Sequence, residues 1–496
     1  MKIQLSTHFF RFFTVKRAIH PSVSLLIFAI SIILSDILVS LIRPTFFAGP
    51  YWLALALVLL FFSIIVPRFP FILLAGLSGF LLISWRAGPD LLAQDFFKNS
   101  IGQNVTITGK ITKDPTTSAS EKLNITLTNL EISEQEIAGQ LFTQVDPKID
   151  IQRSDTLTIS GKLSEGFGNY SISMFRPKIQ KIDRPEPGDV FLKIRNFFAN
   201  KVKDYIPAPQ NGLALGYLLG QKSGVDKNFQ DTLRVVGLTH IIVASGAHLS
   251  TLTGFARKIF KKVSRFAGFL AGILLTIFFI GITGLSASMI RAGLVTGLLL
   301  VAKYFGREIK PLRLIILVAA ATLIFNPAYL SDLAWLLSFA SFTGILVLTP
   351  KISRFFYGKN KKLGVLASTL ISSVAASLLC IPILLYYFGQ MSLISIVANL
   401  LILPTVSFAM GLTFLTGLFA IILPPLANIF GHLSTLLLDY QISVVNFFGE
   451  QKIFLIQIEP NNPAIFVLYI PLMIVFAIYA CYSKYKLRLS RKNLAR

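Results

Sequence analysis

The stretch Phe266-Ala-Gly-Phe-Leu-Ala-Gly-Ile-Leu-Leu-Thr-Ile-Phe-Phe-Ile-Gly-Ile-Thr-Gly284 contains no charged side chain. An α-helix needs about 20 mostly apolar residues to cross the hydrocarbon core of a bilayer. The stretch therefore predicts a membrane-spanning helix. With it, the apolar runs of the chain predict about twelve helical membrane segments. The other runs are Ser22–Ile42, Tyr51–Val66, Phe69–Trp85, Leu238–Phe255, Ala287–Val301, Leu314–Phe325, Leu333–Leu348, Gly364–Phe388, Ser392–Ile422, Leu426–Phe447 and Ala464–Tyr482.

The composition excludes a water-soluble globular protein. Of the 496 residues, 54% are hydrophobic and 14% are charged, and the mean hydropathy is +0.68. A soluble domain carries about 25% charged residues. The first apolar run is too long for the core of a signal peptide, so we interpret it as a retained span. The two cysteines, Cys380 and Cys481, lie in apolar segments and predict neither a disulfide framework nor a metal site.

A polar insertion, residues 99–184, interrupts the apolar runs. Val105–Ile111, Leu123–Leu127 and Thr156–Leu163 place apolar side chains at every second position, which is typical of β-strands. Turn residues such as those at Asp114-Pro115 separate the runs. A small OB-like β-barrel fits the length of the insertion. The chain is therefore expected to be a polytopic α-helical membrane protein with an inserted OB-like β domain.

The segments on either side of the insertion complete the predicted organisation. Membrane segments precede it in residues 1–98, and residues 185–210 follow it as a linker. Within this linker Val190 to Tyr205 read as a basic amphipathic helix in the headgroup region. Pro382 and Pro404 interrupt later apolar runs, and irregular backbone at membrane depth is tolerated only inside protein or beside a water-filled cavity. Those breaks therefore indicate a lined passage.

The net charge of +24 permits two interpretations. Basic residues beside membrane spans hold loops in the cytoplasm, whereas a basic protein can also bind a polyanion such as nucleic acid. Most of the excess lies beside predicted spans, in residues 257–265, 303–313, 351–362 and the tail 484–496. If every cluster lies in the cytoplasm, the number of predicted spans between successive clusters must be even, and the predicted spans meet this condition. This predicts cytoplasmic termini and an extracytoplasmic β domain.

The most informative polar residues lie in the segment Gly237-Leu-Thr-His-Ile-Ile-Val-Ala-Ser-Gly-Ala-His248. Polar and ionisable groups at membrane depth are costly and usually mark a functional interior. His240, Ser245, Gly246 and His248 are therefore candidate site residues. A hydrogen-bonded pair that packs spans together is the plainest alternative. A zinc site and a serine hydrolase remain weaker alternatives, since tetrahedral zinc needs more ligands and no carboxylate follows to orient a base.

Further candidates lie downstream in three short elements. Arg291 opens an apolar segment, where it could reach the interface by its long side chain or meet phosphate in a wet cavity. Asp332 lies in a predicted turn between two apolar runs, and Asn399 and Pro404 lie in a later apolar run. Either element could instead simply kink a helix. The candidates are Thr283, Gly284, Arg291, Asp332, Ser338, Asn399 and Pro404.

The ordered set of motifs resembles the ComEC competence family. The set consists of Leu218-Leu219-Gly220, His240…Ser245-Gly246-Ala247-His248, Thr283-Gly284…Arg291-Ala292, Gly306-Arg307, Asn326-Pro327…Asp332…Leu337-Ser338-Phe339 and Asn399…Pro404. Each motif alone is weak, but their order is specific. Gln221 and Leu336 depart from the family pattern, which often has Asp and Gln at those places. The resemblance marks residues 211–483 as a competence-type channel domain followed by the basic tail.

This resemblance implies a channel of the inner membrane that admits single-stranded DNA during natural transformation. It implies an outer-face DNA receptor, a cytoplasmic ATP-driven DNA translocase and membrane lipid as partners. Many members carry a metallo-β-lactamase-like nuclease, but the chain as given has only five histidines, too few for a two-metal site. We therefore expect a separate nuclease, no cofactor and no enzymatic activity, and the oligomeric state stays open.

Charge within the insertion argues against DNA binding by the β domain. Residues 99–184 contain ten Lys and Arg and ten Asp and Glu, and their aromatic residues are few. A platform for single strands needs a basic groove and stacking rings. We therefore expect DNA contact in the membrane part and in the basic helix of residues 190–205, and leave the barrel as a docking module. A transporter or flippase of another anionic substrate is the main rival hypothesis, and an intramembrane hydrolase is the weaker one.

Overall fold

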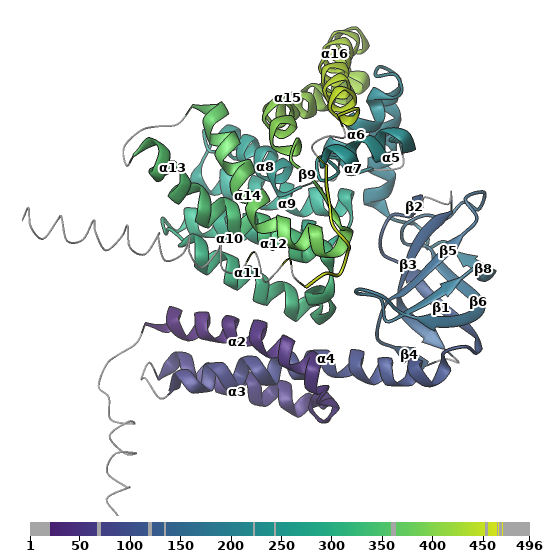
Figure 1. The fold of residues 1–496 in the computed structure, drawn as a ribbon, viewed down its shortest axis with the longest axis vertical. Helices are drawn as coiled ribbons and strands as arrows, with labels where there is room; N and C mark the ends of the chain where they lie inside the picture. The colour runs from purple at the N-terminus through teal and green to yellow at the C-terminus, as the bar shows by residue number, and fades with distance from the viewer. Residues whose placement is uncertain are drawn as a thin grey trace, which may run out of the picture. The chain divides into compact units, whose positions relative to one another are not determined.

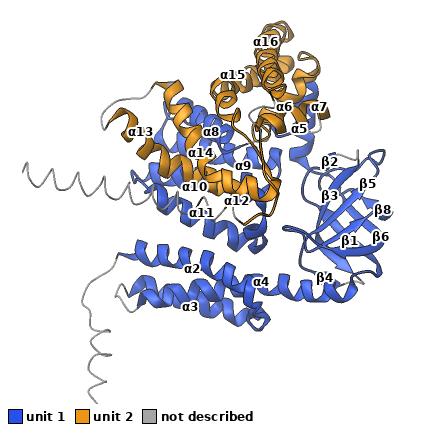
Figure 2. Cartoon of the chain, in the orientation of Figure 1, with its two compact units in different colours: residues 1–201, 219–223, 244–336 blue, residues 202–218, 224–243, 337–496 orange. Residues whose placement is uncertain are grey.

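The computed structural model describes residues 20–66, 71–117, 122–132, 135–221, 224–242, 245–358, 364–451 and 455–463, together with residues 465 and 469. The chain divides into two compact units (Figure 2). Unit 1 contains residues 1–201, 219–223 and 244–336, and unit 2 contains residues 202–218, 224–243 and 337–496.

Unit 1 begins with three apolar helices, which Figure 1 shows side by side. They are α2 (Pro21–Ile42), α3 (Pro50–Ile65) and α4 (Ile72–Ser100), with a short 3₁₀ turn at Thr45–Ala48. Small residues let α2 and α4 approach closely, as in many membrane helix pairs. A Cβ on Gly79 would lie 2.7 Å from the carbonyl oxygen of Phe28. Ser78 donates a hydrogen bond of 2.6 Å to the carbonyl of Ala56 on α3, so this buried hydroxyl is satisfied.

The inserted segment folds into a small β-barrel. Strand β1 pairs with β3, β3 with β5, β5 with β7, β7 with β6, and β6 pairs back with β1. All these pairs are antiparallel except β5 with β7. This closed ring of five strands has the organisation of an OB fold. The strands are β1 (Asn104–Ile111), β2 (Thr116–Thr117), β3 (Leu123–Ile132), β4 (Gln135–Ile137), β5 (Leu141–Val145), β6 (Thr156–Glu165), β7 (Ile172–Phe175) and β8 (Lys178–Asp183).

The interior of the barrel follows from the period-two pattern. Ile107, Leu127, Leu157 and Ile159 are fully buried and belong to one apolar core. Phe97, near the end of α4, is buried in the same core. The apolar helix α4 thus continues into the barrel, which fixes the β domain to this helix within unit 1.

The rest of unit 1 is helical. It contains most of α5 (Val190–Lys203), and then α8 (Gly246–Phe260), α9 (Arg265–Thr283), α10 (Ala287–Tyr304), α11 (Pro311–Phe325) and the 3₁₀ turn η3 (Pro327–Ser331). Helices α8, α9 and α10 share an apolar cluster of Leu249, Phe279, Met289 and Ala292. Exposed apolar side chains such as Leu274 and Ile277 lie on the outer side of α9.

Unit 2 contains the remaining elements. They are α6 (Gln210–Leu219), α7 (Lys227–Val236), most of α12 (Leu333–Thr343) with a π-helical turn at Gly344–Leu348, α13 (Thr349–Tyr357), α14 (Val365–Phe388), β9 (Gln390–Ser392), α15 (Ser395–Ile422), α16 (Pro424–Gly449) and β10 (Leu455–Gln457). Buried polar side chains join these helices. Gln441 accepts a 3.0 Å hydrogen bond from the Tyr217 hydroxyl and donates one of 2.8 Å to Thr405.

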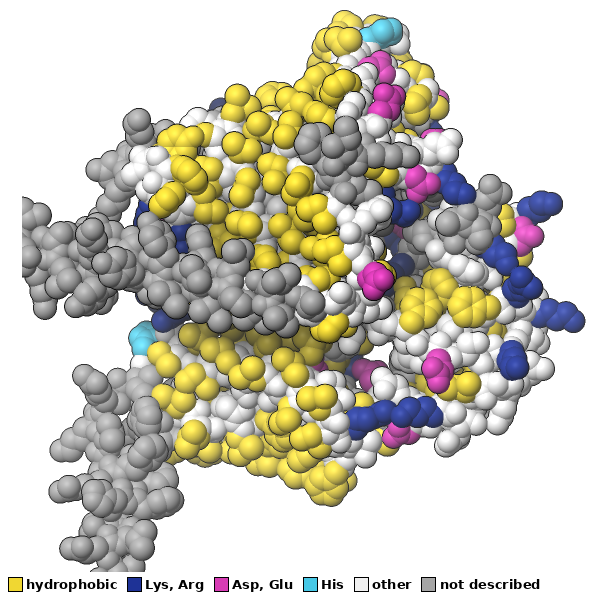
Figure 3. Space-filling model, in the orientation of Figure 1, with side chains coloured by type: hydrophobic (Ala, Val, Ile, Leu, Met, Phe, Trp, Pro, Cys, Tyr) yellow, Lys and Arg dark blue, Asp and Glu magenta, His cyan; other side chains and the backbone are white. Residues whose placement is uncertain are grey.

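The class predicted from composition holds, because six described helices are long and apolar enough to cross a membrane. They include α2, α4, α9, α14, α15 and the continuous helix Leu333–Tyr357. Hydrophobic side chains cover much of the helical surface in Figure 3. The total of about twelve segments and the placement of the β domain outside remain predictions. Most of the predicted span Ala464–Tyr482 lies outside the described residues.

Two sequence-based expectations are wrong, and two helices were not predicted. Helices α14 and α15 run through Pro382 and Pro404 without a break, and proline is tolerated inside membrane helices where other groups satisfy the freed backbone carbonyl. The predicted span Leu238–Phe255 is replaced by a turn and a helix that begins at Gly246, since Ser245 takes an extended N-cap conformation. Helices α6 and α7 were not predicted, because their apolar runs are short and partly polar.

Candidate functional site

The first turn of α8 holds three of the predicted residues together. Ser245 is the N-cap, Gly246 is the first helical residue, and His248 folds back toward the cap. The backbone N–H of Ser245 donates a 3.2 Å hydrogen bond to Nδ1 of His248. His248 is buried within unit 1. Its hydrogen bond from the Ser245 N–H stabilises the start of the helix. Its capping bond fits the packing alternative raised from the sequence.

The first turn of α8 lies near α10. A Cβ placed on Gly246 would lie 3.4 Å from the Cβ of Ala292, so an added methyl group would just reach α10. The two helices pack together through the buried Leu249 and Ala292. Arg291 precedes Ala292 and is buried, with 8% of its surface exposed. Its Nη2 donates a 3.3 Å hydrogen bond to the hydroxyl of Ser288, one turn earlier. The motif at 245–248 and the motif at 291–292 are therefore parts of one site.

The turn between α9 and α10 closes the same region. Gly284 has φ of +88°, a conformation that side-chain-bearing residues rarely adopt. Thr283 donates a 2.8 Å hydrogen bond to the carbonyl of Phe279. Ser286 then accepts from the Met289 N–H at 3.3 Å and caps α10. The Thr-Gly pair ends α9, and α10 then begins at Ala287, four residues before Arg291.

Two buried arginines that the sequence did not single out hold this turn. Arg153 donates to the carbonyls of Gly281 at 3.0 Å and Ile282 at 3.4 Å. Arg195 of α5 donates to Ile282 at 3.3 Å. Cations at the carbonyl end of a helix are favoured by its dipole. Together with their carboxylate partners, Asp189 and Asp114, we call these residues the arginine node.

Each carboxylate of the arginine node accepts hydrogen bonds from the guanidinium of its arginine partner. Asp189 pairs with Arg153 at 2.8 Å, and Asp114 receives both terminal nitrogens of Arg195 at 2.5 and 3.0 Å. Burial by itself raises the pKa of Asp189. Hydrogen bonds from the Leu192 N–H, the Arg153 guanidinium and Ser154 outweigh burial and hold the pKa below its ordinary value. The β domain and α5 are thus joined to the end of α9 by charged groups.

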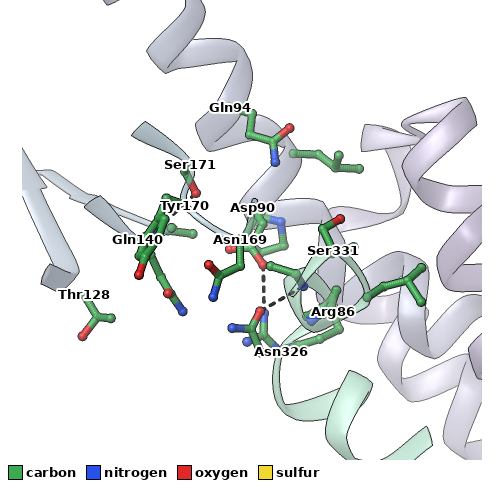
Figure 4. Close-up of a pocket in the computed structure, with 18 of the residues that line it drawn as sticks. Arg86, Asp90, Gln94, Thr128, Gln140, Asn169, Tyr170, Ser171, Asn326 and Ser331 are labelled. Atoms are coloured by element: carbon green, nitrogen blue, oxygen red, sulfur yellow. Dashed lines mark hydrogen bonds and ion pairs between the residues drawn. The ribbon is translucent and has the colours of Figure 1, made fainter. Parts of the chain in front are cut away.

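The Asn-Pro motif lies on a cavity of about 690 Å³ within unit 1 (Figure 4). Figure 4 shows Arg86 and Asp90 of α4, Tyr170 of the barrel, and Asn326 around it. Arg86 donates a 2.9 Å hydrogen bond to the carbonyl of Phe325, which ends α11. Asn326 caps η3 by accepting from the Ala328 N–H at 3.0 Å. The cavity therefore lies between the barrel, α4 and this motif.

The charges of the cavity do not favour phosphate. Its described lining includes the carboxylates of Asp36, Asp90 and Glu136 and the single guanidinium of Arg86. Asp332, the predicted residue of this motif, accepts a 3.0 Å hydrogen bond from Asn169 of the barrel. This bond ties the β6–β7 loop to the motif. Asp332 thus helps to hold the barrel against the Asn-Pro motif.

The other predicted residues belong to unit 2 and form no common site there in the described residues. His240 is exposed in the turn after α7. Ser338 is half-buried on α12, and Asn399 is buried on α15, with no described partner for its Oδ1. Pro404 lies inside the same helix as Asn399. Among the described residues, no three His, Cys, Asp or Glu side chains gather closely enough to hold a metal.

Comparison with known proteins gives a consistent result. The family described as Competence protein matches residues 217–482. ComE operon protein 3 of Bacillus subtilis (strain 168) is 30% identical over 286 residues, which are 56% of this chain and 34% of that protein. The uncharacterized protein YcaI of Escherichia coli (strain K12) is 24% identical over 264 residues, which are 50% of this chain and 35% of YcaI.

The aligned part spans about a third of the length of each of these relatives. No solved structure matches the chain significantly. The matched residues include every predicted motif from His240 to Pro404.

Proposed function

Because this chain belongs to the competence protein family, we propose that it conducts a single strand of DNA across the cytoplasmic membrane during natural transformation. The observation that carries this proposal is the packing of α8 against α10, where Leu249, Met289 and Ala292 share a buried apolar cluster. That packing places the first turn of α8 against the buried segment that carries Arg291. Polar groups of this kind in an apolar helical region are characteristic of a transport pathway.

The chemistry of the site suits a phosphate backbone. A guanidinium can bind a phosphate group through two hydrogen bonds. Helix N-termini favour anions, and both α8 and α10 begin in this region. In the proposed pathway, Arg291 gives each passing phosphate a transient contact, while His248 holds the first turn of α8 in place through its hydrogen bond from the Ser245 N–H.

The proposed arrangement in the cell follows from the basic loops. The β domain lies outside the membrane, both termini lie in the cytoplasm, and about twelve segments enter the bilayer. An outer-face receptor supplies DNA, a separate nuclease removes one strand, and an ATP-driven translocase draws the other strand inward. If deletion of the gene leaves DNA uptake intact, the protein is instead a transporter of another anionic substrate.

Uptake of labelled DNA into cells that carry point variants tests the proposal. Arg291→Ala should reduce uptake at least about tenfold, the effect of removing a charged hydrogen bond worth ~1.5–3 kcal/mol. Arg291→Lys should retain part of the uptake, because lysine keeps the charge without the two-pronged geometry. Lys303→Ala changes an exposed cation on the same helix and should have little effect. Normal uptake by Arg291→Ala, with the protein inserted at wild-type levels, would reject the proposal.

A further inference from the structure

Asp36 is the only ionisable residue of α2. The other side chains of this helix are apolar or are serine hydroxyls, and the helix is long and apolar enough to cross a membrane. Asp36 is buried, with 4% of its surface exposed. An ionisable group at membrane depth is costly and usually marks a path for a substrate, an ion or a proton. Packing alone does not explain a carboxyl group at this position.

The carboxyl group of Asp36 has an unused acceptor atom. Its Oδ2 is shielded from solvent and has no hydrogen-bond partner among the described residues. The guanidinium nearest at hand in the same cavity, that of Arg86, is already engaged, because it pairs with Asp90 at 3.6 Å and donates to the Phe325 carbonyl at 2.9 Å. A carboxylate buried without a cation or a donor is strongly disfavoured, and a proton removes its charge.

The cavity of about 690 Å³ gives water access to this group. Asp36 is part of its lining. Since a water molecule takes up about 30 Å³ in the liquid, the cavity has room for many. Gln140, Asn169 and Asn326 give it polar walls (Figure 4). Oε1 of Gln140 is a second buried acceptor without a partner among the described residues. Water in the cavity can therefore exchange a proton with Asp36.

The elements packed against α2 bring no free cation to Asp36 within the described part of the chain. These elements are α3, α4, α11 and η3. Arg313 of α11 lies at the other end of α2, where it donates to Ser22 at 3.4 Å, and Arg43 after α2 pairs with Asp95 at 2.9 Å. The other titratable groups on these elements and in the cavity are Tyr51, Arg86, Asp90, Lys98, Glu136, Tyr170 and Tyr329.

The charge of the cavity favours a cationic ligand. Its described lining contains the carboxyl groups of Asp36, Asp90 and Glu136 and one guanidinium, that of Arg86. A metal ion needs several ligands at one point. No three His, Cys, Asp or Glu side chains gather in this way among the residues that the structure describes. A proton needs only one acceptor atom, and Oδ2 of Asp36 provides it.

We propose that Asp36 is a proton-binding site, whose carboxyl group takes up and releases a proton through the cavity. The exchange is a simple acid–base step: hydronium gives its proton to the carboxylate oxygen and leaves as water, and water takes the proton back in the reverse step. This inference goes beyond the proposed function, because it involves neither the transported polymer nor Arg291.

The proton site lies beside the contact that holds the barrel. The turn η3 packs against α2 and lines the same cavity, and Asn326 caps it. Asp332 follows this turn and accepts the hydrogen bond of 3.0 Å from Asn169 of the barrel. A change in the charge of Asp36 therefore takes place next to the elements that join α2, α11 and the β domain.

Labelling with the hydrophobic reagent dicyclohexylcarbodiimide tests this proposal on the purified full chain in nanodiscs. The reagent adds to a protonated carboxyl group in an apolar environment and does not add to the ionised form. Mass spectrometry should locate the adduct at Asp36 at about pH 6. The yield should fall at least about tenfold by about pH 9, because each pH unit changes the ratio of the two protonation states tenfold.

Asp95 of α4 is the matched control. Its side chain is 54% exposed and pairs with Arg43, so at about pH 6 it should give at least about tenfold less adduct than Asp36. The absence of an adduct at Asp36 would overturn the proposal, as would a yield that stays the same between the two pH values. Protection of Asp36 by sodium ions at constant pH would overturn it in favour of a metal-ion site.

Infrared difference spectra give a second measurement that needs no reagent. Between about pH 6 and about pH 9 the wild type should lose a carbonyl band of a carboxylic acid. Asp36→Asn keeps the size and the neutral charge of the protonated group and should lack this band. Persistence of the band in Asp36→Asn would assign it to another residue and reject the proposal.

Failure of the proposed function has a different signature. Both measurements on Asp36 are made without DNA. If deletion of the gene leaves DNA uptake intact while Asp36 is labelled with the expected pH dependence, the transport proposal fails and the proton site stands. If Arg291→Ala loses uptake while Asp36 gives neither the adduct nor the band, the reverse holds.

Discussion

Gly284 illustrates what a single residue does at the turn between α9 and α10. Its φ of +88° is accessible to glycine, and a Cβ there would lie 3.0 Å from Nη1 of Arg153. Gly284→Ala should therefore strain the backbone by ~1–3 kcal/mol and disturb the arginine node. Thermal unfolding of the purified protein should show a lower midpoint for this variant.

The matched control for that prediction is Gly297→Ala. Gly297 lies on α10 with open space around its Cα, and alanine favours the helix by up to about 1 kcal/mol. Its unfolding midpoint should stay the same or rise. Equal destabilisation by the two variants would contradict the role assigned to Gly284.

Single residues could be proposed from the sequence where a motif is short and continuous. The motifs that contain Ser245, Gly246, His248 and Arg291 are of this kind, and the structure packs their helices together through Leu249 and Ala292. The roles of these residues stay predictions. Arg153 gave no signal, because it lies in a polar loop among nine other basic residues of the insertion. Its partners on α9 are backbone carbonyls, which have no side-chain signature.

At the scale of elements, the arginine node joins α9 to the β domain. Arg153→Ala would leave Asp189, with 14% of its side chain exposed, without its guanidinium. Removing one partner of a buried ion pair costs ~3–5 kcal/mol. Arg153→Lys should cost less, and Lys181→Ala, which breaks an exposed pair with Asp183, should cost at most about 1 kcal/mol. Chemical unfolding would measure all three.

The pH dependence of this element has a defined sign. The pKa of Asp189 is held below its ordinary value, so its contribution to stability is complete above the unfolded pKa of about 3.9. That contribution is lost as the pH falls through the lower folded value. Between pH 7 and 5 the difference in stability between wild type and Arg153→Ala should therefore stay constant. A difference that disappears within this range would contradict the assignment.

Elements were predictable where one pattern continued for a whole run. The period-two alternation predicted the strands, and uninterrupted apolar runs predicted α2 and α9. The span Leu238–Phe255 failed because hydropathy does not register a helix start inside an apolar run. The signal was present as Ser245 three residues before His248, the spacing of a capping box. The closed strand order could not be read from the sequence, since it depends on which edges pair.

For the whole molecule, the basic loops predict which side each part faces. Lys162, exposed on β6, should lie outside, and Arg307, exposed after α10, should lie in the cytoplasm. The chain has two cysteines, so replacing Cys380 and Cys481 with alanine gives a background for single-cysteine labelling. An impermeant maleimide should then label Lys162→Cys in intact spheroplasts.

Arg307→Cys should react with the same maleimide only after the membrane is opened. The physical reason is that moving a cluster of cations through the bilayer is costly, so basic loops stay on the cytoplasmic side during insertion. The expected pattern would place the β domain on the outer side of the membrane and the basic loops in the cytoplasm. Labelling of both positions from outside would contradict the predicted number of crossings between them. The reverse pattern would place the β domain in the cytoplasm, and incoming DNA would then reach the membrane helices without first passing the β domain.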